Sequence, residues 1–588
     1  MHRRSILLII LISLITFSNS LSSGFVGDDR LIIVNNTFYE TWANFPKLFT
    51  PEYITNSDET FNLENFSHTG SVAYRPVLSA TFFLDYWLWQ RVPFGYHLHS
   101  VLLHILNAVL VYFILFQLLK NLSLALWAAV LFAVHPFKSE AVSAIGYRAD
   151  LLATFFFLLA FSGYIIQDRF RAAGRLLPSG GKRKAIEVLS YGAFFMAAFT
   201  KESAVVFIGI LMAYDVLVKK EKAEAVLKYF YGRYLGYALI TLFYLYVYLY
   251  VFRNSTLDNM RFLGGTMPTH VSVGVAIFVQ YLAGFVFPWT VKVLPPVYAP
   301  PMAGYAAWAG LTLFIFLAYK ICRRPTGSNA TVFFVAWFLV TLIPVSNVVL
   351  LVSPMAYRFM YLPSVGLLAA VGILLSKAGA YLDRRLRGIP VGAALRWGII
   401  ALCVIQTISL NMAWKSNLVM ASMIVRDFPA SPIGYLHLGI EYFRLGAVGK
   451  ARAALENGFA RGLNDPRGYY YLGLCYFNDW KRARPYYEES IRQFPYYALS
   501  YVGLGRIDVL GGHYAQAIPY LEKALVLSPS YAGYGYLIQA YIRTNRLDDA
   551  LAVYQRAQGT LQEKSQLGSL EKLIEEGNNL RGSVDIGI

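Results

Sequence analysis

Long apolar runs separated by short polar loops fill the first 415 residues, a pattern typical of a bundle of membrane-spanning helices. With the N-terminal apolar run they predict about 11–13 spans. Several runs are too short to cross the hydrocarbon core as straight helices, so kinked or re-entrant helices are expected. The runs lie at 97–119, 122–135, 150–167, 188–200, 203–218, 234–252, 271–290, 304–321, 330–352, 363–377 and 396–414.

The N-terminus carries a basic pair, Arg3–Arg4, followed by an apolar run from Ile6 to Phe17. A cleaved signal peptide has these features, but the stretch lacks a clear A-x-A site and a polytopic region follows it. We therefore interpret residues 1–22 as a retained signal-anchor helix. In either case residues 23–96 are expected outside the cytoplasm, as the first extracytoplasmic loop.

The loops between the apolar runs fix an orientation. Four of them are basic and are placed in the cytoplasm by the positive-inside rule: 168–184, 219–228, 322–325 and 377–387. This arrangement leaves both ends of the 271–290 run outside. A re-entrant segment or a tight helical pair is therefore expected there.

After Trp414 the chain becomes amphipathic and repeats itself with a period of about 34 residues, which is the tetratricopeptide spacing. Four units are expected between 431 and 560, after a linker at 416–430 and before a capping helix and tail at 561–588. The units begin at Leu438–Gly439, Leu472–Gly473, Leu504–Gly505 and Leu537–Ile538, and their small residues are Ala451, Ala483, Ala517 and Ala550. Such repeats form an α-solenoid whose concave face binds a partner or an acceptor polypeptide.

The composition agrees with an all-α membrane protein. Of 588 residues, 57% are hydrophobic and 15% charged, and the mean hydropathy of +0.46 excludes an ordinary soluble domain. The net charge of +18 gathers in short loops rather than in a basic stripe, so no nucleic-acid partner is expected. Three scattered cysteines are too few for a disulfide framework or a zinc site.

Ionisable residues gather in the loops that this orientation places outside. They are Asp28, Asp29, Arg75, His135, Glu140, Arg148, Asp150, Lys201, Glu202 and Arg358. Each alone fits a local ion pair or a side chain that reaches toward lipid head groups. Because charge near lipid is costly, their collection at one membrane face predicts a functional site.

Several motifs resemble, in the same order, the transmembrane and tetratricopeptide-repeat-containing glycosyltransferases. They are "FVGDDR", "YRPVLSATFFLDYWLW", "HPFKSEAVSAIGYRADLL", "KES" and "YRFMYLPSVG", followed by the repeats. The resemblance implies a GT-C-like membrane domain at 97–415. It also implies inverting transfer of a sugar, mannose by default, from a polyprenyl-phosphate donor to a hydroxyl of a protein or glycan acceptor.

The resemblance gives the candidate residues roles. One aspartate of the pair is expected to act as the general base, with Asp29 favoured over Asp28. Arg358 is the first candidate for binding the donor phosphate, because arginine presents a planar fork to phosphate oxygens. The weaker phosphate candidates are Arg148, Arg75 and Lys201, and the supporting or sugar-binding candidates are Glu140, Asp150, Glu202 and His135.

One position departs from the family pattern, since Tyr357 stands where an acid usually precedes the arginine. No metal site is predicted, although the aspartate pair with a nearby histidine leaves a divalent ion open. A non-catalytic scaffold that uses the repeats to assemble envelope proteins is the alternative function, and transport is disfavoured. A bacterial inner membrane with a periplasmic site is the expected location, and the endoplasmic reticulum with a lumenal site is the alternative.

Overall fold

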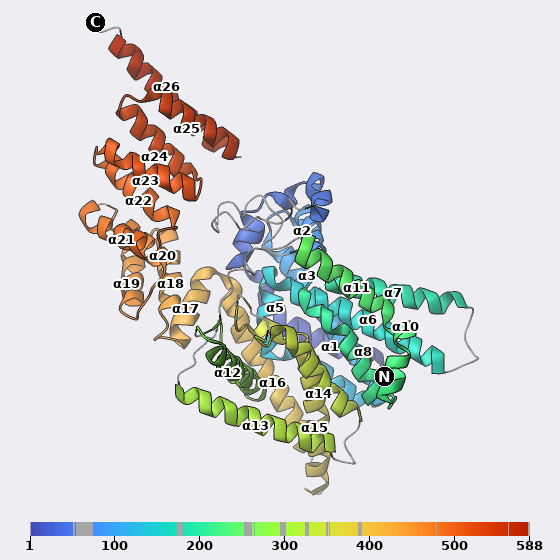
Figure 1. Ribbon diagram of the computed structural model, residues 1–588. Helices are drawn as coiled ribbons and strands as arrows, with labels where there is room; N and C mark the ends of the chain where they lie inside the picture. The colour runs from blue at the N-terminus through green and yellow to red at the C-terminus, as the bar shows by residue number, and fades with distance from the viewer. Residues whose placement is uncertain are drawn as a thin grey trace. The chain divides into compact units, whose positions relative to one another are not determined.

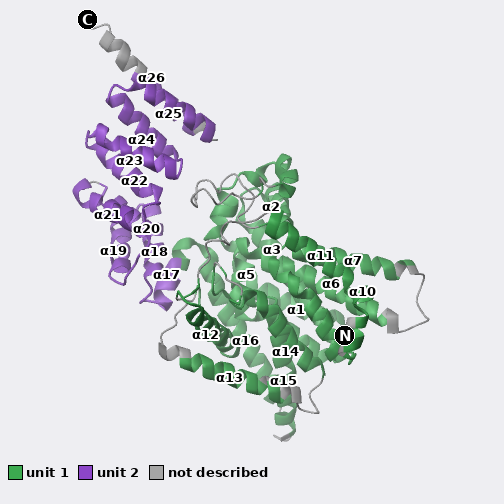
Figure 2. Ribbon diagram, in the orientation of Figure 1, with its two compact units in different colours: residues 1–55, 66–420 green, residues 56–65, 421–588 purple. Residues whose placement is uncertain are grey.

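The computed structural model describes residues 2–50, 53, 74–172, 180–251, 262–263, 265–294, 301–323, 329–348, 351, 353–385, 391–477, 479–561 and 564–585. Within these ranges the regular structure is entirely helical. The all-α class expected from the sequence is confirmed. The chain forms two compact units, residues 1–55 with 66–420 and residues 56–65 with 421–588 (Figure 2).

The first unit is a helical bundle. Each of the eleven apolar runs overlaps a helix, although the 330–352 run extends past Leu342, where α14 ends. Neighbouring helices such as α6 and α7 run side by side (Figure 1). The helices are α1 (His2–Phe17), α2 (Pro76–Trp89), α3 (Pro93–Leu119), α4 (Leu122–Val134), α5 (Ser139–Ser143), α6 (Arg148–Ala172), α7 (Gly180–Ala198), α8 (Phe207–Leu217), α9 (Ala223–Lys228), α10 (Phe230–Arg233), α11 (Leu235–Tyr246), α12 (Met267–Val286), α13 (Pro301–Arg323), α14 (Asn329–Leu342), α15 (Pro363–Arg385) and α16 (Val391–Asn411).

Six helical segments in the described ranges are long and apolar enough to cross a membrane. They are His2–Ser22, Pro93–Leu119, Ile145–Arg169, Met267–Val286, Pro363–Arg384 and Val391–Lys415. A seventh candidate is broken: Leu122–Val134 and Pro136–Ser143 meet at an angle of 53°. Three further apolar helices are shorter, Leu235–Val251, Tyr305–Leu317 and Asn329–Val345. The structure therefore describes a multi-pass membrane protein in which several apolar runs form short helices.

One local expectation differs from the structure. The 271–290 run, for which a re-entrant segment or helical pair was expected, lies on one continuous twenty-residue helix, α12, which ends before Phe287. The break occurs instead after α4. There His135 leaves the helical conformation before Pro136, because a proline disfavours helical geometry in the residue that precedes it.

The N-terminal helix α1 packs into the bundle against α3, α4 and α16. Ile9 and Phe17 on this helix are fully buried, and His2 shares a 2.8 Å hydrogen bond with the Tyr112 hydroxyl. The amide of Asn411, at the end of α16, donates to the Thr16 carbonyl at 3.0 Å. The first helix therefore packs into the bundle through its buried side chains and through hydrogen bonds at both ends.

The segment that follows α1 folds into short helical turns and packs on α2. Tyr39 and Tyr53 bring their hydroxyls to Ser79 of α2, at 3.1 and 2.6 Å. The Tyr39 ring also meets Phe83 edge-on, with the ring centroids 5.3 Å apart. An aromatic cluster therefore packs the described part of this segment, residues 25–50 and 53, onto α2.

The second unit contains paired helices and ends in α26 (Lys564–Asp585). The pairs are α18 (Pro432–Arg444) with α19 (Val448–Phe459), α20 (Pro466–Cys475) with α21 (Trp480–Gln493), α22 (Ala498–Leu510) with α23 (Tyr514–Leu527), and α24 (Tyr531–Arg543) with α25 (Leu547–Thr560). Small residues let the paired helices approach closely. A Cβ added at Gly505 would lie 2.4 Å from Cγ of Leu521, and Ala517 is fully buried. The linker expected at 416–430 is mostly helical, because α17 (Asn417–Asp427) occupies it.

Candidate functional site

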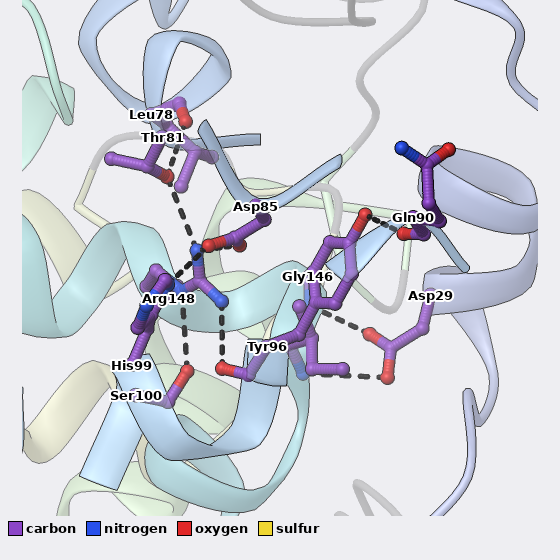
Figure 3. A network of polar contacts seen from close by, with 11 residues as sticks. Asp29, Leu78, Thr81, Asp85, Gln90, Tyr96, His99, Ser100, Gly146 and Arg148 are labelled. Atoms are coloured by element: carbon purple, nitrogen blue, oxygen red, sulfur yellow. Dashed lines mark hydrogen bonds and ion pairs between the residues drawn. The ribbon is translucent and has the colours of Figure 1, made fainter. Parts of the chain in front are cut away.

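The carboxylate of Asp29 is buried between the turn it occupies and the start of α6. It accepts a hydrogen bond from the backbone N–H of Gly146 at 2.6 Å (Figure 3). The backbone N–H groups of Ile145 and Val26 also donate to it, at 3.3 Å each. Burial raises its pKa to about 7, and the neighbouring Asp28 charge adds to the rise. Asp29 therefore joins two segments 116 or more positions apart, with only 2% of the residue exposed.

Asp28 has the opposite environment, because its side chain is exposed. Its carboxylate accepts a hydrogen bond from the hydroxyl of Tyr147 at 3.0 Å. The turn before it is set by Gly27, whose φ of +59° lies in the left-handed region that favours glycine. Of the two adjacent aspartates, Asp28 is thus the one that an acceptor in solution is able to reach.

Arg358 lies on the other side of Tyr147. Its guanidinium carbon is 3.8 Å from the centroid of the tyrosine ring, a cation–π contact. The guanidinium also pairs with the Glu140 carboxylate, which accepts the Arg358 backbone N–H at 3.0 Å as well. Burial lowers the pKa of Arg358, but Glu140 outweighs this effect and the net shift is upward.

An acid was expected directly before Arg358, where Tyr357 stands. Glu140 pairs with the arginine instead. Tyr357 itself is buried and stacks on Phe137, with the ring centroids 5.2 Å apart. Glu140 comes from α5, the short helix after the break in the 122–143 segment. The partner of Arg358 is thus an acid 218 positions away in the sequence.

Two further ion pairs lie on segments next to this group. The guanidinium of Arg75 donates to both carboxylate oxygens of Glu202, at 3.0 and 3.1 Å. Lys201 donates to Asp150 at 2.5 Å. Burial acts to raise the pKa of Glu202, yet Arg75 and Lys201 outweigh it and the pKa is lowered. Burial lowers the pKa of Lys201 despite its acid partner.

The ring of Phe359 lies between the two groups of charges. The guanidinium carbon of Arg358 lies 5.0 Å from its centroid, and Nζ of Lys201 lies 5.2 Å from it. The structure therefore brings together eight of the ten residues expected at the site: Asp28, Asp29, Arg75, Glu140, Asp150, Lys201, Glu202 and Arg358. Of the cations, Arg75 and Arg358 keep 26% and 12% of their side chains exposed.

Arg148 does not face this group, and the expectation that it binds donor phosphate needs correction. Its guanidinium is 2% exposed and pairs with Asp85 of α2 (Figure 3). The remaining N–H groups donate to Ser100, Thr81 and the carbonyl of Tyr96, at 3.2, 3.3 and 2.8 Å. These partners occupy all three guanidinium nitrogens, so Arg148 ties α2 and α3 to the start of α6.

His135 also lies apart from the charged group. It is buried at the break after α4, where its ring nitrogens contact the Phe285 carbonyl at 3.4 Å and the Phe137 backbone N–H at 3.3 Å. Within the described ranges, no three His, Cys, Asp or Glu side chains come close enough to hold a metal ion. The contacts with Phe285 and Phe137 give His135 a role in capping the broken helix.

Two residues of this region were missed by the sequence analysis. Asp85 was hidden inside the apolar stretch "FFLDYWLW", where a lone acid in a membrane-facing run predicts a buried partner. Tyr147 directly precedes Arg148 in "GYRAD" and lacks any charge of its own. Its bridging position between Asp28 and Arg358 depends on a contact across 119 positions, which no local pattern indicates.

Comparison with known proteins identifies the repeats and finds a partial likeness to named proteins. Tetratricopeptide repeat models match residues 436–498, 476–532 and 509–574, which confirms the expected repeats. Mouse protein O-mannosyl-transferase TMTC1 is 33% identical over 218 residues, and human TMTC3 is 31% identical over 215. Part of the chain is similar to the TMTC proteins. These matches cover 36% and 37% of this chain.

The likeness to the TMTC proteins is partial in length. The chain spans 22% of the length of TMTC1 and of TMTC3. A Caenorhabditis elegans protein O-mannosyl-transferase, F38B6.6, is 35% identical over 161 residues, which are 27% of this chain and 22% of that protein. The crystal structure of the APC/C hetero-tetramer Cut9–Hcn1 aligns over 86% of this chain and 91% of that one, at 14% identity and a TM-score of 0.26, which is too low to support an argument.

Proposed function

We propose that this chain is a GT-C-like glycosyltransferase that moves a sugar, by default mannose, from a polyprenyl-phosphate donor to a protein hydroxyl. The observation that carries the proposal is the exposed Asp28 carboxylate, linked through Tyr147 to the half-buried Arg358. A base and a phosphate-binding cation are the two groups that such a transfer requires. The named activity of the TMTC relatives supports the same reaction.

Asp28 is the general base in this proposal, and Asp29 is a positioning residue. The Asp28 carboxylate takes the proton of the acceptor hydroxyl while that oxygen attacks the anomeric carbon from the face opposite the phosphate. The bond from the anomeric carbon to the phosphate oxygen breaks, and the phosphate leaves with the electron pair, so the configuration inverts. Asp29 is too deeply buried to touch an acceptor and holds the turn against the start of α6.

Arg358 stabilises the negative charge that develops on the leaving phosphate, and Arg75 is the second cation that does so. Both keep part of the side chain exposed, whereas Lys201 is 5% exposed and held by Asp150. Glu140 and Glu202 keep the two guanidinium groups in place before the donor binds. A guanidinium held in this way needs little rearrangement to bind a phosphate oxygen.

The helix directions support an extracytoplasmic site. Arg148 begins α6 and Lys201 follows α7, whereas the basic 168–184 loop joins the other ends of these two helices. Pro363 begins α15 just after Arg358, and the basic 377–387 stretch lies at its far end. We place the site and the repeats in the periplasm of a bacterial inner membrane, or in the lumen of the endoplasmic reticulum. The repeats bind the acceptor or a protein partner.

The test is transfer by the full chain in liposomes. Purified protein is given polyprenyl-phosphate-[¹³C]mannose and a serine- and threonine-rich peptide, and the peptide mass is followed by mass spectrometry. Polyprenyl-phosphate-glucose and an unlabelled acceptor glycan, supplied in parallel, identify another sugar or acceptor. Mass spectra of envelope proteins from cells with and without the gene show the acceptor in its natural setting.

The non-catalytic scaffold predicts a different result. It requires the repeats for the cellular phenotype, while Asp28→Asn leaves that phenotype unchanged. Absence of transfer to every acceptor, together with an intact phenotype in the Asp28→Asn cells, contradicts the enzyme assignment. A phenotype lost in both the Asp28→Asn cells and the cells without the gene supports it.

A further inference from the structure

The turn that carries Asp28 is tied to the segment that leads into the repeats. The backbone N–H of Gly27 donates to Oδ1 of Asn417 at 2.7 Å, although the two residues are 390 positions apart. Three residues earlier, the N–H of Gly24 donates to the Lys415 carbonyl at 3.2 Å. Two hydrogen bonds therefore hold the 24–27 stretch against residues 415–417, directly before the aspartate pair.

The same segment also contacts the residue that binds Asp28. The Trp414 indole meets the Tyr147 ring edge-on, with the centroids 6.2 Å apart and the planes perpendicular. Trp414 is 5% exposed, so its indole is held in place by packing and limits the movement of the Tyr147 ring. Tyr147 in turn donates its hydroxyl to Asp28. The 414–417 segment thus supports Asp28 in two ways, through the backbone of Gly24 and Gly27 just before it and through Tyr147, its hydrogen-bond donor.

The segment is anchored at one end and continues into the repeats at the other. Oδ1 of Asn411 accepts hydrogen bonds from Ser139 and Ser143 at 2.7 and 3.1 Å, which fixes the end of α16 to the helix that carries Glu140. Asn417 is the first residue of α17, and this helix begins in the first compact unit and ends in the second. The residues that support Asp28 therefore lie in the first unit, a few positions before the chain enters the second.

We propose that Trp414 and Asn417 are positioning residues that hold Asp28 in its working place, so that the connection to the repeats forms part of the catalytic site. This inference rests on the proposed transferase function. A misplacement of a catalytic group by about 1 Å costs roughly a hundredfold in rate. Loss of the Asn417 acceptor therefore lowers kcat by about ten- to a hundredfold and leaves KM for the donor within about threefold, since neither residue contacts the phosphate-binding arginines.

The experiment uses two readouts on the full chain, and one of them does not depend on activity. Hydrogen–deuterium exchange followed by mass spectrometry reports the peptide that contains residues 24–34, and transfer kinetics report kcat and KM. The variants are Asn417→Leu, which removes the acceptor oxygen, Asn417→Asp, which keeps it, and Trp414→Leu. Asn121→Ser is the control, because Asn121 is an exposed asparagine at the start of α4, outside the site and the repeats, and serine keeps a capping oxygen there.

We expect faster exchange of the 24–34 peptide and a lower kcat in Asn417→Leu and Trp414→Leu. Asn417→Asp is expected to restore both, and Asn121→Ser to leave both unchanged. Unchanged exchange in Asn417→Leu overturns the structural tie. Faster exchange with an unchanged kcat overturns the positioning role while leaving the transferase function intact. If exchange of the 24–34 peptide depends on Asn417 but the wild-type chain transfers no sugar, the proposed function is overturned, and the positioning role with it.

Discussion

Arg358 and Glu140 are bound through two groups of the arginine, although 218 positions separate them in the sequence. Both the guanidinium and the backbone N–H of Arg358 contact the Glu140 carboxylate. The contact with the guanidinium neutralises the arginine's charge, and the contact with the backbone N–H fixes the turn that carries Arg358. Because the pair is only about a tenth exposed, its energy depends on both partners being present.

The first prediction concerns this pair. Arg358→Gln is expected to lower kcat/KM by about a hundredfold or more, because it removes a cation from the developing phosphate charge. Glu140→Gln is expected to have a smaller effect, since its amide oxygen still accepts from the arginine. The double variant is expected to lose less than the sum of the two single losses, because the residues act as one unit. Transfer kinetics in liposomes measure all three.

The second prediction separates the two aspartates. Asp28→Asn is expected to abolish transfer with an unchanged melting temperature, because the Asp28 side chain is exposed and its removal leaves the core intact. Asp29→Asn is expected to lower the melting temperature, because an amide nitrogen would face backbone N–H groups that now donate to a carboxylate. Full activity of the Asp28→Asn protein would return the role of base to Asp29.

The third prediction is a pH dependence of stability. The unfolded Asp29 ionises near 3.8, whereas the folded carboxyl keeps its proton to about pH 7. The folded state therefore binds more protons between these values, and its stability falls as the pH rises from about 4 to 7. The loss is roughly 4 kcal/mol at most, since each pKa unit corresponds to about 1.4 kcal/mol. Thermal unfolding in detergent at pH 5 and pH 8 measures it.

Asp29→Asn is the control for that pH dependence. It removes the ionisable group, so its melting temperature is expected to be lower throughout yet to change less between the two pH values. An equal change in the wild type and in Asp29→Asn would show that another group titrates in this range.

The fold was largely predictable because its patterns are local. The apolar runs and the 34-residue period each depend on neighbours within a few helical turns, and both are seen in the structure. The helix at Asn417–Asp427 was missed because its composition, NLVMASMIVRD, lacks the repeat pattern that marked the helices after it. The end of α4 was predictable, because the expected 122–135 run stops at the same place, whereas the short helix α5 after it has no apolar run to mark it.

The site was only partly predictable, because burial decides which charges are available. The sequence showed Arg148 as a charge at a membrane face, but its partner Asp85 lies 63 positions away on a helix that was expected to be loop. Likewise, nothing local distinguishes Asp28 from Asp29. One side chain points to solvent and the other is enclosed by residues 145 and 146, and only the fold makes that difference.

The last prediction tests whether Arg148 is structural. Arg148→Met leaves Asp85 buried beside His99 without its arginine, and loss of one partner of a buried pair costs about 3–5 kcal/mol. Arg148→Met is therefore expected to lower the yield of folded protein and its melting temperature. The double variant Arg148→Met with Asp85→Leu is expected to recover much of the stability, because apolar residues of similar volume replace buried pairs with little loss. If Arg148 instead bound the donor phosphate, the stabilised double variant would fold and yet remain inactive. Transfer by that double variant at more than about a tenth of the wild-type rate therefore assigns Arg148 to the scaffold.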